Sequence, residues 1–255
     1  MSDHHDTSDG STATPGPARR PGVVRSAAGL AADVAYIARS RLGPLRYGML
    51  PPPPNDPPND HGGGTARPPV LLIPGVFESW HYLRAIGERL AARGHPVHRV
   101  AELGLNHRPI DRAARLLGDY VVDRDLREVV LVTHSKGGLI GKAMLLADQD
   151  AAAAPLERRL TRLITVNTPF RGTPVARWGL GPWREFRPEA AIIRTLDART
   201  EVNDRITSLV SAVDQYVPRA IAHLDGAENV VLDRVGHFRV LGLPDVLDEI
   251  ERRLP

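Results

Sequence analysis

A serine flanked by small residues stands between a run of apolar residues and a glycine pair. The segment from Val129 to Ile140 reads Val-Val-Leu-Val-Thr-His-Ser-Lys-Gly-Gly-Leu-Ile, with Ser135 in the middle. This pattern predicts a buried strand that passes through a tight turn into a helix. Such a turn requires small residues two positions before and after the serine, here Thr133 and Gly137, and it lifts the hydroxyl clear of the sheet. Ser135 could therefore act as a nucleophile; the plain alternative is an ordinary strand-to-helix turn.

The turn from Thr133 to Gly138 resembles that of the α/β-hydrolase superfamily, and within it the small bacterial lipases and esterases. By the order of its motifs, the resemblance extends over roughly residues 68–255. It implies a chain order of serine, acid, histidine for the catalytic residues. It also implies chemistry that requires neither a metal nor an organic cofactor.

An oxyanion hole in this family needs a second backbone N–H, usually from the loop after the first of these strands. The loop Leu72–Trp80 resembles that family loop, with Pro74 in place of the usual histidine. By that match, the N–H of Val76 joins the N–H of Lys136, at the start of the helix that follows Ser135. A plain Pro-Gly turn that ends the strand is the alternative.

Three histidines lie at or beyond the turn and are candidates for the general base. His237 follows the last predicted strand, next to Gly236, in the loop where the family's base lies. His134 directly precedes the nucleophile and is expected to be structural. His223 precedes the last strand and is expected at the surface or in a helix. We therefore predict that His237 is the base.

The acid is expected after the preceding strand. The predicted strand Ile206–Ser211 leads to Asp214, in a loop that resembles the acid loop of the family. Asp214 is therefore the predicted partner of His237, and Asp233 and Asp225 remain the alternatives.

Short apolar runs separated by helical patterns surround these residues, which is typical of a parallel sheet with crossover helices. The predicted strands are Val70–Ile73, Val97–Val100, Val129–Val132, Leu163–Val166, Ile206–Ser211 and Asn229–Leu232. The predicted helices between and after them are Tyr82–Arg93, Ile110–Arg127, Gly138–Ala147 and Pro244–Leu254. These elements predict an α/β fold with a mostly parallel sheet of about six strands and flanking helices. The resemblance described above implies that this is the α/β-hydrolase fold.

The composition excludes several other classes of protein. The 255 residues include 33 Lys and Arg against 30 Asp and Glu, which gives a net charge of +3 and does not predict a nucleic-acid partner. There are no cysteines, so disulfides and thiolate metal sites are excluded. No apolar run is long enough to span a membrane, and the first residues do not resemble a signal peptide, so we expect a cytoplasmic protein.

The amino-terminal quarter differs in composition from the rest. Proline and glycine predict a disordered tail over residues 1–22 and an extended linker over about 50–68, ahead of a catalytic domain at 69–255. Between tail and linker, alanine, valine and isoleucine at helical spacing predict an amphipathic helix over about 23–42, with Arg25, Asp33 and Arg39 off its apolar face. Its arginines could place it on an anionic membrane surface as a peripheral contact. Docking on the protein's own domain is the alternative.

A long connection between the fourth and fifth predicted strands indicates a small cap over about 171–200. Two of the three tryptophans lie in it, as expected for a lid over an acyl-binding cleft, although a cap packed shut is the alternative. The predicted substrate-binding residues are Phe77, Trp80, Phe170, Trp178 and Trp183.

Together these features predict a serine hydrolase of the lipase or esterase type, acting on a small-molecule or lipid ester. A thioesterase or an acyltransferase could use the same residues. The remaining alternative is a non-catalytic, membrane-associated binding module with this fold.

Overall fold

The computed structural model describes residues 23–43, 45, 67–151 and 158–255. Its centre is a sheet of six strands in the order β2-β1-β3-β4-β5-β6, and every neighbouring pair is parallel. The strands are β1 (Val70–Ile73), β2 (Val97–His98), β3 (Val129–His134), β4 (Leu160–Val166), β5 (Ile206–Val213) and β6 (Glu228–Val235). The predicted parallel sheet is confirmed, with β2 shorter and most other strands longer than the apolar runs.

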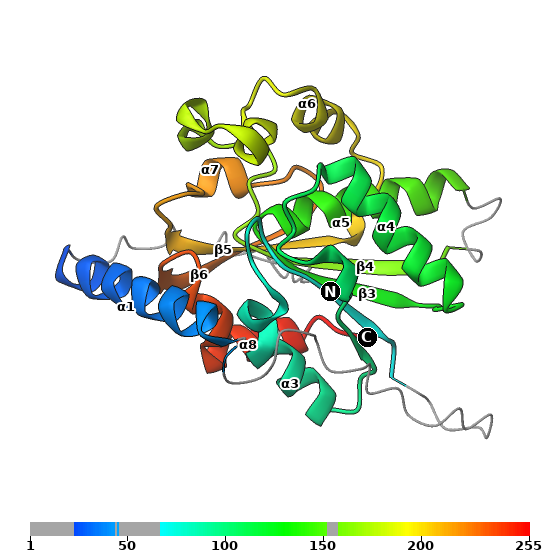
Figure 1. Cartoon of the computed structure of the whole chain (residues 1–255), viewed down its shortest axis with the longest axis horizontal. Coiled ribbons are helices and arrows are strands. Elements are labelled where there is room, and N and C mark those ends of the chain that lie inside the picture. The colour runs from blue at the N-terminus through cyan, green and yellow to red at the C-terminus, as the bar shows by residue number, and fades with distance from the viewer. Residues whose placement is uncertain (1–22, 44, 46–66, 152–157) are drawn as a thin grey trace, which may run out of the picture.

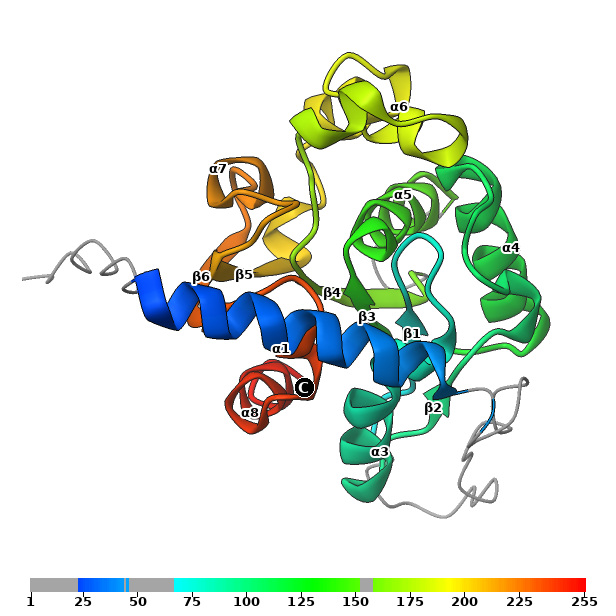
Figure 2. The ribbon, with the colours of Figure 1, turned by 60° about the vertical axis from the view of Figure 1, so that its left-hand side comes forward.

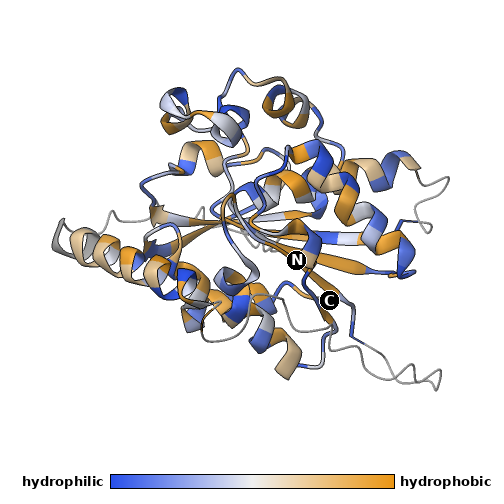
Figure 3. Cartoon of the chain, viewed as in Figure 1, coloured by the Kyte–Doolittle hydropathy of each residue, from blue (hydrophilic) through white to orange (hydrophobic). Residues whose placement is uncertain are grey.

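Helices cover both faces of this sheet, as Figures 1 and 2 show. The helices are α1 (Val23–Arg41), α3 (Arg84–Ala92), α4 (Ile110–Asp123), α5 (Lys136–Ala151), α6 (Ala191–Ala198), α7 (Arg219–Ala222) and α8 (Pro244–Glu251). Helices α4 and α5 pack on one face, and α3 and α8 pack on the other. Because both faces are covered, strands β1 and β3 are buried along their whole length and carry apolar colour in Figure 3.

The successive side chains of β3 divide the core into two layers. Leu131 packs with α4 and α5, whereas Val130 and Val132 pack with α3 and α8. This alternation follows from the two-residue period of a strand. Because all strands run parallel, the segments that follow β3, β5 and β6 leave the sheet at the same edge. That edge is where open α/β sheets bind ligands.

Helix α1 has the predicted extent but docks through a different face. Val34, on the apolar face expected from the periodicity, is 66% exposed. The buried side chains are instead those of Asp33, Tyr36 and Ser40. Asp33 was expected off the contact face, and the structure corrects that prediction. Apolar periodicity misses this face because the carboxylate is buried against hydrogen-bond donors.

Close backbone approach helps α1 to dock on the sheet. A Cβ atom at Gly29 would lie 2.6 Å from Cβ of Val235, at the end of β6. The Tyr36 hydroxyl donates a hydrogen bond of 2.8 Å to the carbonyl oxygen of Tyr82. The helix therefore lies across the domain beside β6 and the segment before α3 (Figure 2). Docking on the protein's own domain is the alternative that these contacts support.

The connection between β4 and β5 contains the 3₁₀ helices Pro174–Trp178 and Gly181–Phe186, then α6 and a third 3₁₀ helix, Asn203–Arg205. In Figures 1 and 2 this segment lies above α5 and α7, beyond the carboxyl edge of the sheet. Its position between the fourth and fifth strands matches the predicted cap.

The predicted tail over residues 1–22 and nearly all of the linker predicted over about 50–68 lie outside the described residues. The domain boundary at residue 69 stays a prediction. Of the helices that the structure describes, none is long and apolar enough to cross a membrane.

Candidate active site

Ser135 occupies a strained turn between β3 and α5. Its φ angle is 50°, in the left-handed region that side chains other than glycine rarely adopt. The turn is tied to the end of β4, since Ser135 N–H donates to the carbonyl oxygen of Val166 at 2.9 Å. Thr168 Oγ1 donates to the carbonyl oxygen of Ser135 at 3.0 Å. Ser135 is half-buried between two fully buried neighbours, as expected for an exposed hydroxyl on a rigid turn.

Glycine beyond the serine is required because the turn passes close to β1. A Cβ atom at Gly137 would lie 2.1 Å from the carbonyl oxygen of Ile73. A Cβ atom at Gly138 would lie 2.0 Å from Thr168 Oγ1. Both positions therefore exclude any side chain, which explains the Gly-Gly pair in the sequence.

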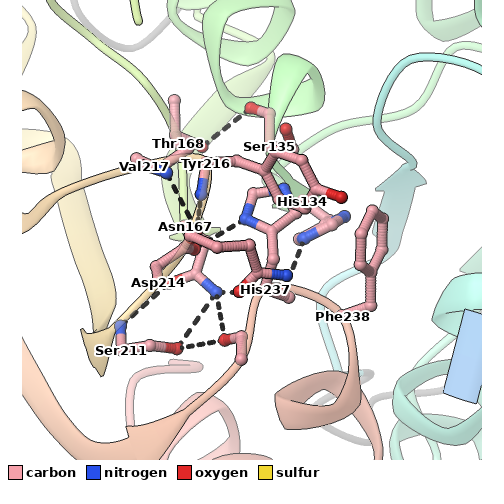
Figure 4. A network of polar contacts seen from close by, with 12 residues as sticks. His134, Ser135, Asn167, Thr168, Ser211, Asp214, Tyr216, Val217, His237 and Phe238 are labelled. Atoms are coloured by element: carbon pink, nitrogen blue, oxygen red, sulfur yellow. Dashed lines mark hydrogen bonds and ion pairs between the residues drawn. The ribbon is translucent and has the colours of Figure 1, made fainter. Parts of the chain in front are cut away.

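His237 and Asp214 form a buried pair at the same edge of the sheet as Ser135 (Figure 4). His237 Nδ1 lies 2.6 Å from Asp214 Oδ2, and both side chains are almost completely shielded from solvent. The other oxygen, Asp214 Oδ1, accepts the N–H groups of Tyr216 at 2.7 Å and Val217 at 2.8 Å. The carboxylate is thus held by its own loop and oriented toward the imidazole.

The contact with Asp214 determines the tautomer of neutral His237 and shifts its pKa. An ionised carboxylate has no proton to donate, so His237 Nδ1 carries the hydrogen and Nε2 is left as the acceptor. Burial by itself would lower the pKa of His237, but the charge of Asp214 and its hydrogen bond raise it above its usual value. More distant carboxylates, Glu78 and Asp33, act in the same direction. A neutral His237 can therefore take a proton at Nε2.

The backbone on either side of His237 is held by side chains from other strands. Asn167, which directly follows β4, donates from Nδ2 to the carbonyl oxygen of His237 at 3.0 Å. Ser211 Oγ donates to the carbonyl oxygen of Gly236 at 2.8 Å. Asn167 Oδ1 in turn accepts the N–H of Ser211 at 2.8 Å. Figure 4 shows this network, which ties β4, β5 and the loop after β6 together.

A second buried pair, formed by Glu78 and His134, lies behind His237. His134 Nδ1 is 2.9 Å from both carboxylate oxygens of Glu78. His134 Nε2 is 3.1 Å from the carbonyl oxygen of His237, to which it can only donate. The two imidazole rings have centroids 4.6 Å apart. His134 is structural, as predicted, and its contact orients the backbone of His237.

The loop after β1 approaches the nucleophile closely. Gly75 N–H donates to Glu78 Oε2 at 2.9 Å, and a Cβ atom at Gly75 would lie 3.1 Å from Cβ of Ser135. Val76, the predicted oxyanion donor, is half-buried in this loop. Lys136, the other predicted donor, is the first residue of α5, so its N–H has no partner within the helix. Both predicted donors thus lie on segments next to Ser135.

The side chain of Lys136 is buried and makes structural contacts. Its Nζ donates to the carbonyl oxygen of Asn106 at 3.2 Å and to that of Arg108, and lies 3.9 Å from Glu185 in the segment between β4 and β5. Burial lowers the pKa of Lys136 to about 8, although Glu185 opposes that shift. This lysine therefore ties the start of α5 to the loop before α4.

The predicted substrate-binding residues are distributed over three environments. Phe77 and Trp80 line one cavity of about 510 Å³ beside the loop after β1. Phe170 is 1% exposed and packs in the core with α5, so the structure places it away from the described cavities. Trp178 is 91% exposed, and Trp183 packs edge to face on a neighbouring ring of the cap.

The alternative acids and base lie elsewhere. Asp225 is an exposed residue that pairs with Arg171 at 2.8 Å and with His223 at 3.2 Å. Asp233 is an exposed residue within β6. Within the described ranges, no group of three or more His, Cys, Asp or Glu residues is placed to hold a metal ion.

Sequence reasoning missed the residues that support this site. Glu78 and Asn167 carried no motif of their own. Glu78 lies in the loop after β1 and Asn167 directly follows β4, so position at the carboxyl edge of the sheet was the signal that could have identified them.

Comparison with known proteins supports the fold. No protein-family model matches the sequence, and no curated protein matches it. Among solved structures, the lipase BlEst2 of Bacillus licheniformis in mature form aligns with a TM-score of 0.59 and 14% identity, over 80% of this chain and 100% of that chain. The ydeN gene product of B. subtilis aligns with a TM-score of 0.55 and 20% identity, over 72% and 97% of the two chains. An extracellular α/β-hydrolase from a Paenibacillus species aligns with a TM-score of 0.52 and 13% identity, over 73% and 99%.

The chain therefore has the α/β-hydrolase fold that the sequence predicts. Its structural neighbours include lipases and other hydrolases, and at these identities the likeness establishes the fold alone.

Proposed function

We propose that this protein is a serine hydrolase that cleaves carboxylic esters through an acyl-enzyme on Ser135. The observation that carries the proposal is the buried pair of His237 and Asp214, 2.6 Å apart, at the sheet edge that also presents Ser135 on a strained turn. This combination of a nucleophile, a base and a carboxylate that orients the base is the arrangement that acyl transfer requires.

In the first half of the reaction, Ser135 Oγ attacks the carbonyl carbon of the ester while His237 Nε2 accepts its proton. Asp214 keeps the imidazole in the correct tautomer and stabilises the charged ring that forms. The N–H groups of Val76 and Lys136 stabilise the negative oxygen of the tetrahedral intermediate. His237 then donates its proton to the leaving alcohol, and the acyl group remains on Ser135.

In the second half, water enters and gives a proton to His237 Nε2 as it attacks the acyl-enzyme. The same donors stabilise the second tetrahedral intermediate, and its collapse returns the proton to Ser135 Oγ. The products are a carboxylic acid and an alcohol. The protein is regenerated without any change in oxidation state.

The test is hydrolysis of p-nitrophenyl esters of increasing chain length by the wild type and by Ser135→Ala. We expect turnover by the wild type and a loss of roughly 10³-fold or more in the variant, with an unchanged circular dichroism spectrum. Acyl-thioesters assayed beside the esters distinguish a thioesterase. No turnover of any acyl compound by the folded wild type would favour the non-catalytic module.

A further inference from the structure

The residues that line the cavity beside Phe77 and Trp80 include buried hydrogen-bond donors for which the described part of the chain supplies no acceptor. The cavity lies at the carboxyl ends of β1 and β2, has a volume of about 510 Å³, and is lined also by Arg41 and Arg99. This size is typical of small-molecule sites. Pro74, two residues before Val76 in the proposed oxyanion loop, forms part of the wall. The cavity therefore borders the proposed active site.

Arg99 is the most informative residue of this cavity. It directly follows β2, and its guanidinium carbon lies 5.8 Å from the ring centroid of Trp80. Arg99 Nε and Trp80 Nε1 are both buried and have no hydrogen-bond partner among the described residues. Buried donors of this kind carry a free-energy cost unless an acceptor reaches them.

The other lining residues supply apolar surface and no negative charge. Leu83 and Leu103 are buried, whereas Phe77 and Leu105 are 43% and 51% exposed. No described residue that lines the cavity is an aspartate or a glutamate. Glu88, whose charge acts on Arg99, is itself paired with Arg84. A ligand that fits this cavity therefore needs an apolar chain and an anionic group.

We infer that this cavity binds the anionic end of an amphiphilic ligand, a carboxylate or phosphate that Arg99 and Trp80 contact while its apolar chain lies along Phe77 and Leu105. The assignment of this ligand as substrate or product rests on the proposed function. The binding itself does not, because the cavity can be tested in a protein without a nucleophile.

The experiment measures binding by isothermal titration calorimetry to Ser135→Ala. The probes are octanoate, octyl phosphate and neutral octan-1-ol. We expect at least one anion to bind about tenfold or more tightly than octan-1-ol, because charge-assisted hydrogen bonds add to the apolar contact. The preferred anion identifies the headgroup.

Substitutions of the lining residues test whether the anion binds in this cavity. Arg99→Gln, added to Ser135→Ala, is expected to weaken anion binding about tenfold and to change octan-1-ol binding by less than about twofold. Trp80→Phe keeps the ring, removes one donor and is expected to weaken anion binding a few-fold. Arg127→Gln is the matched control, because Arg127 is exposed and precedes β3 at the opposite edge of the sheet.

Equal affinity for octan-1-ol and both anions would overturn the inference. So would anion affinity that neither Arg99→Gln nor Trp80→Phe changes. Anion binding without hydrolysis of any ester by the wild type would retain this site and reject the proposed function.

A separate observation concerns the buried carboxylate of Asp33, on helix α1. Asp33 is 1% exposed. Its Oδ1 accepts the N–H of Phe238 at 2.6 Å and that of Arg239 at 2.7 Å, and its Oδ2 accepts Gln215 Nε2 at 2.7 Å. Phe238 directly follows the proposed base, and Gln215 directly follows the proposed acid. One carboxylate thus ties the two loops together.

The geometry points to Asp33 as a positioning residue that holds His237 against Asp214. The groups that face His237 are the carboxylates of Asp214, Glu78 and Asp33, together with the rings of His134 and Tyr216. Through this residue, helix α1 becomes part of the proposed active site. The expected effect of Asp33 on turnover rests on the proposed function, whereas its expected effect on the pKa of His237 does not.

The test compares Asp33→Asn with Asp123→Asn, a control at an exposed carboxylate near the end of α4. Because the negative charge of Asp33 helps to raise the pKa of His237, we expect Asp33→Asn to lower that pKa. We also expect kcat for an ester to fall about tenfold or more with little change in KM. A residue that only stabilised the fold would lower the melting temperature without moving the pKa.

NMR titration of His237, assigned by comparison with His237→Gln, reads the pKa without turnover. An unchanged His237 pKa in folded Asp33→Asn would overturn the proposed role. A lowered pKa in a protein that hydrolyses no ester would support the contact and count against the proposed function.

Discussion

His134 Nε2 donates a hydrogen bond of 3.1 Å to the carbonyl oxygen of His237, although 103 residues separate the two in the sequence. The histidine before the proposed nucleophile therefore holds the backbone of the proposed base. Glu78 holds the other side of the His134 ring. The loop after β1, the end of β3 and the loop after β6 are thus connected through buried polar groups, which makes the site rigid before any ligand binds.

The buried carboxylate of Glu78 is expected to be important for stability. Glu78→Gln removes the negative charge that faces His134 and alters the acceptor of Gly75 N–H, so we expect a loss of about 3 kcal/mol in the free energy of unfolding. The measurement is urea denaturation. Glu88→Gln is the control: its exposed ion pair with Arg84 is expected to contribute less than about 0.5 kcal/mol. Equal effects of the two variants would contradict the role of the buried pair.

The pH dependence of hydrolysis follows from the raised pKa of His237. The base must be neutral, so kcat/KM rises as the pH increases through that pKa and falls as the pH decreases through it. We expect the midpoint of this limb above the usual value of 6.5. The measurement is kcat/KM for a soluble p-nitrophenyl ester between pH 5 and 9.

Removal of the acid is expected to change this profile. Asp214→Asn removes the carboxylate that raises the pKa of His237, so the midpoint should move to lower pH and kcat should fall roughly 10³- to 10⁴-fold. Asp225→Asn, at the exposed alternative acid, should leave both quantities unchanged. A strong effect of the second variant and none of the first would reassign the acid.

Two glycines test how tightly the turn is packed. Gly137→Ala places a Cβ atom 2.1 Å from the carbonyl oxygen of Ile73, so we expect a loss of about 3 kcal/mol in stability and a loss of activity. Gly118→Ala, within α4, meets no atom within 4 Å and should gain about 0.5–1 kcal/mol. Thermal and urea unfolding measure both. Similar free energies of unfolding for the two variants would contradict the tight packing of the turn at Gly137.

Lys142 is fully buried on α5, and its Nζ has no hydrogen-bond partner in the described part of the chain. Burial lowers its pKa to about 8, so below that pH the folded protein carries a desolvated charge. The unfolded chain keeps the proton up to about pH 10.5, and stability should therefore rise with pH between these two values.

The variant Lys142→Met keeps most of the side-chain volume and removes this charge. We expect it to be more stable than the wild type at pH 7, with a difference that shrinks toward pH 10. The variant should retain only the pH-dependent rise that Lys136 contributes. Urea denaturation at several pH values measures this, and a variant less stable than the wild type at pH 7 would contradict it.

The elements that local patterns define were predictable from the sequence. Ser135 stands within a strand, a turn and a helix that are contiguous, so apolar periodicity and the Gly-Gly pair predict its setting. Asp214 and His237 lie in the loops that follow two predicted parallel strands, and parallel strands bring such loops to one edge of the sheet. The resemblance to a known family added the order of these residues.

Contacts between distant segments could not be predicted in this way. Asp33 accepts hydrogen bonds from two loops, and Glu78 pairs with His134 of β3; only the folded chain brings these segments close. A single sequence carries no record of such pairs. The docking face of α1 was missed for the same reason, since its buried residues are polar. Phe170 was predicted to contact substrate, whereas its side chain is buried in the core with α5.

The most direct test of the proposed nucleophile is covalent labelling with a fluorophosphonate, followed by mass mapping of the labelled peptide. We expect one label per chain, on the peptide that contains Ser135, and much slower labelling of His237→Gln. No label on the folded wild type, or a label on another serine, would contradict the proposed mechanism.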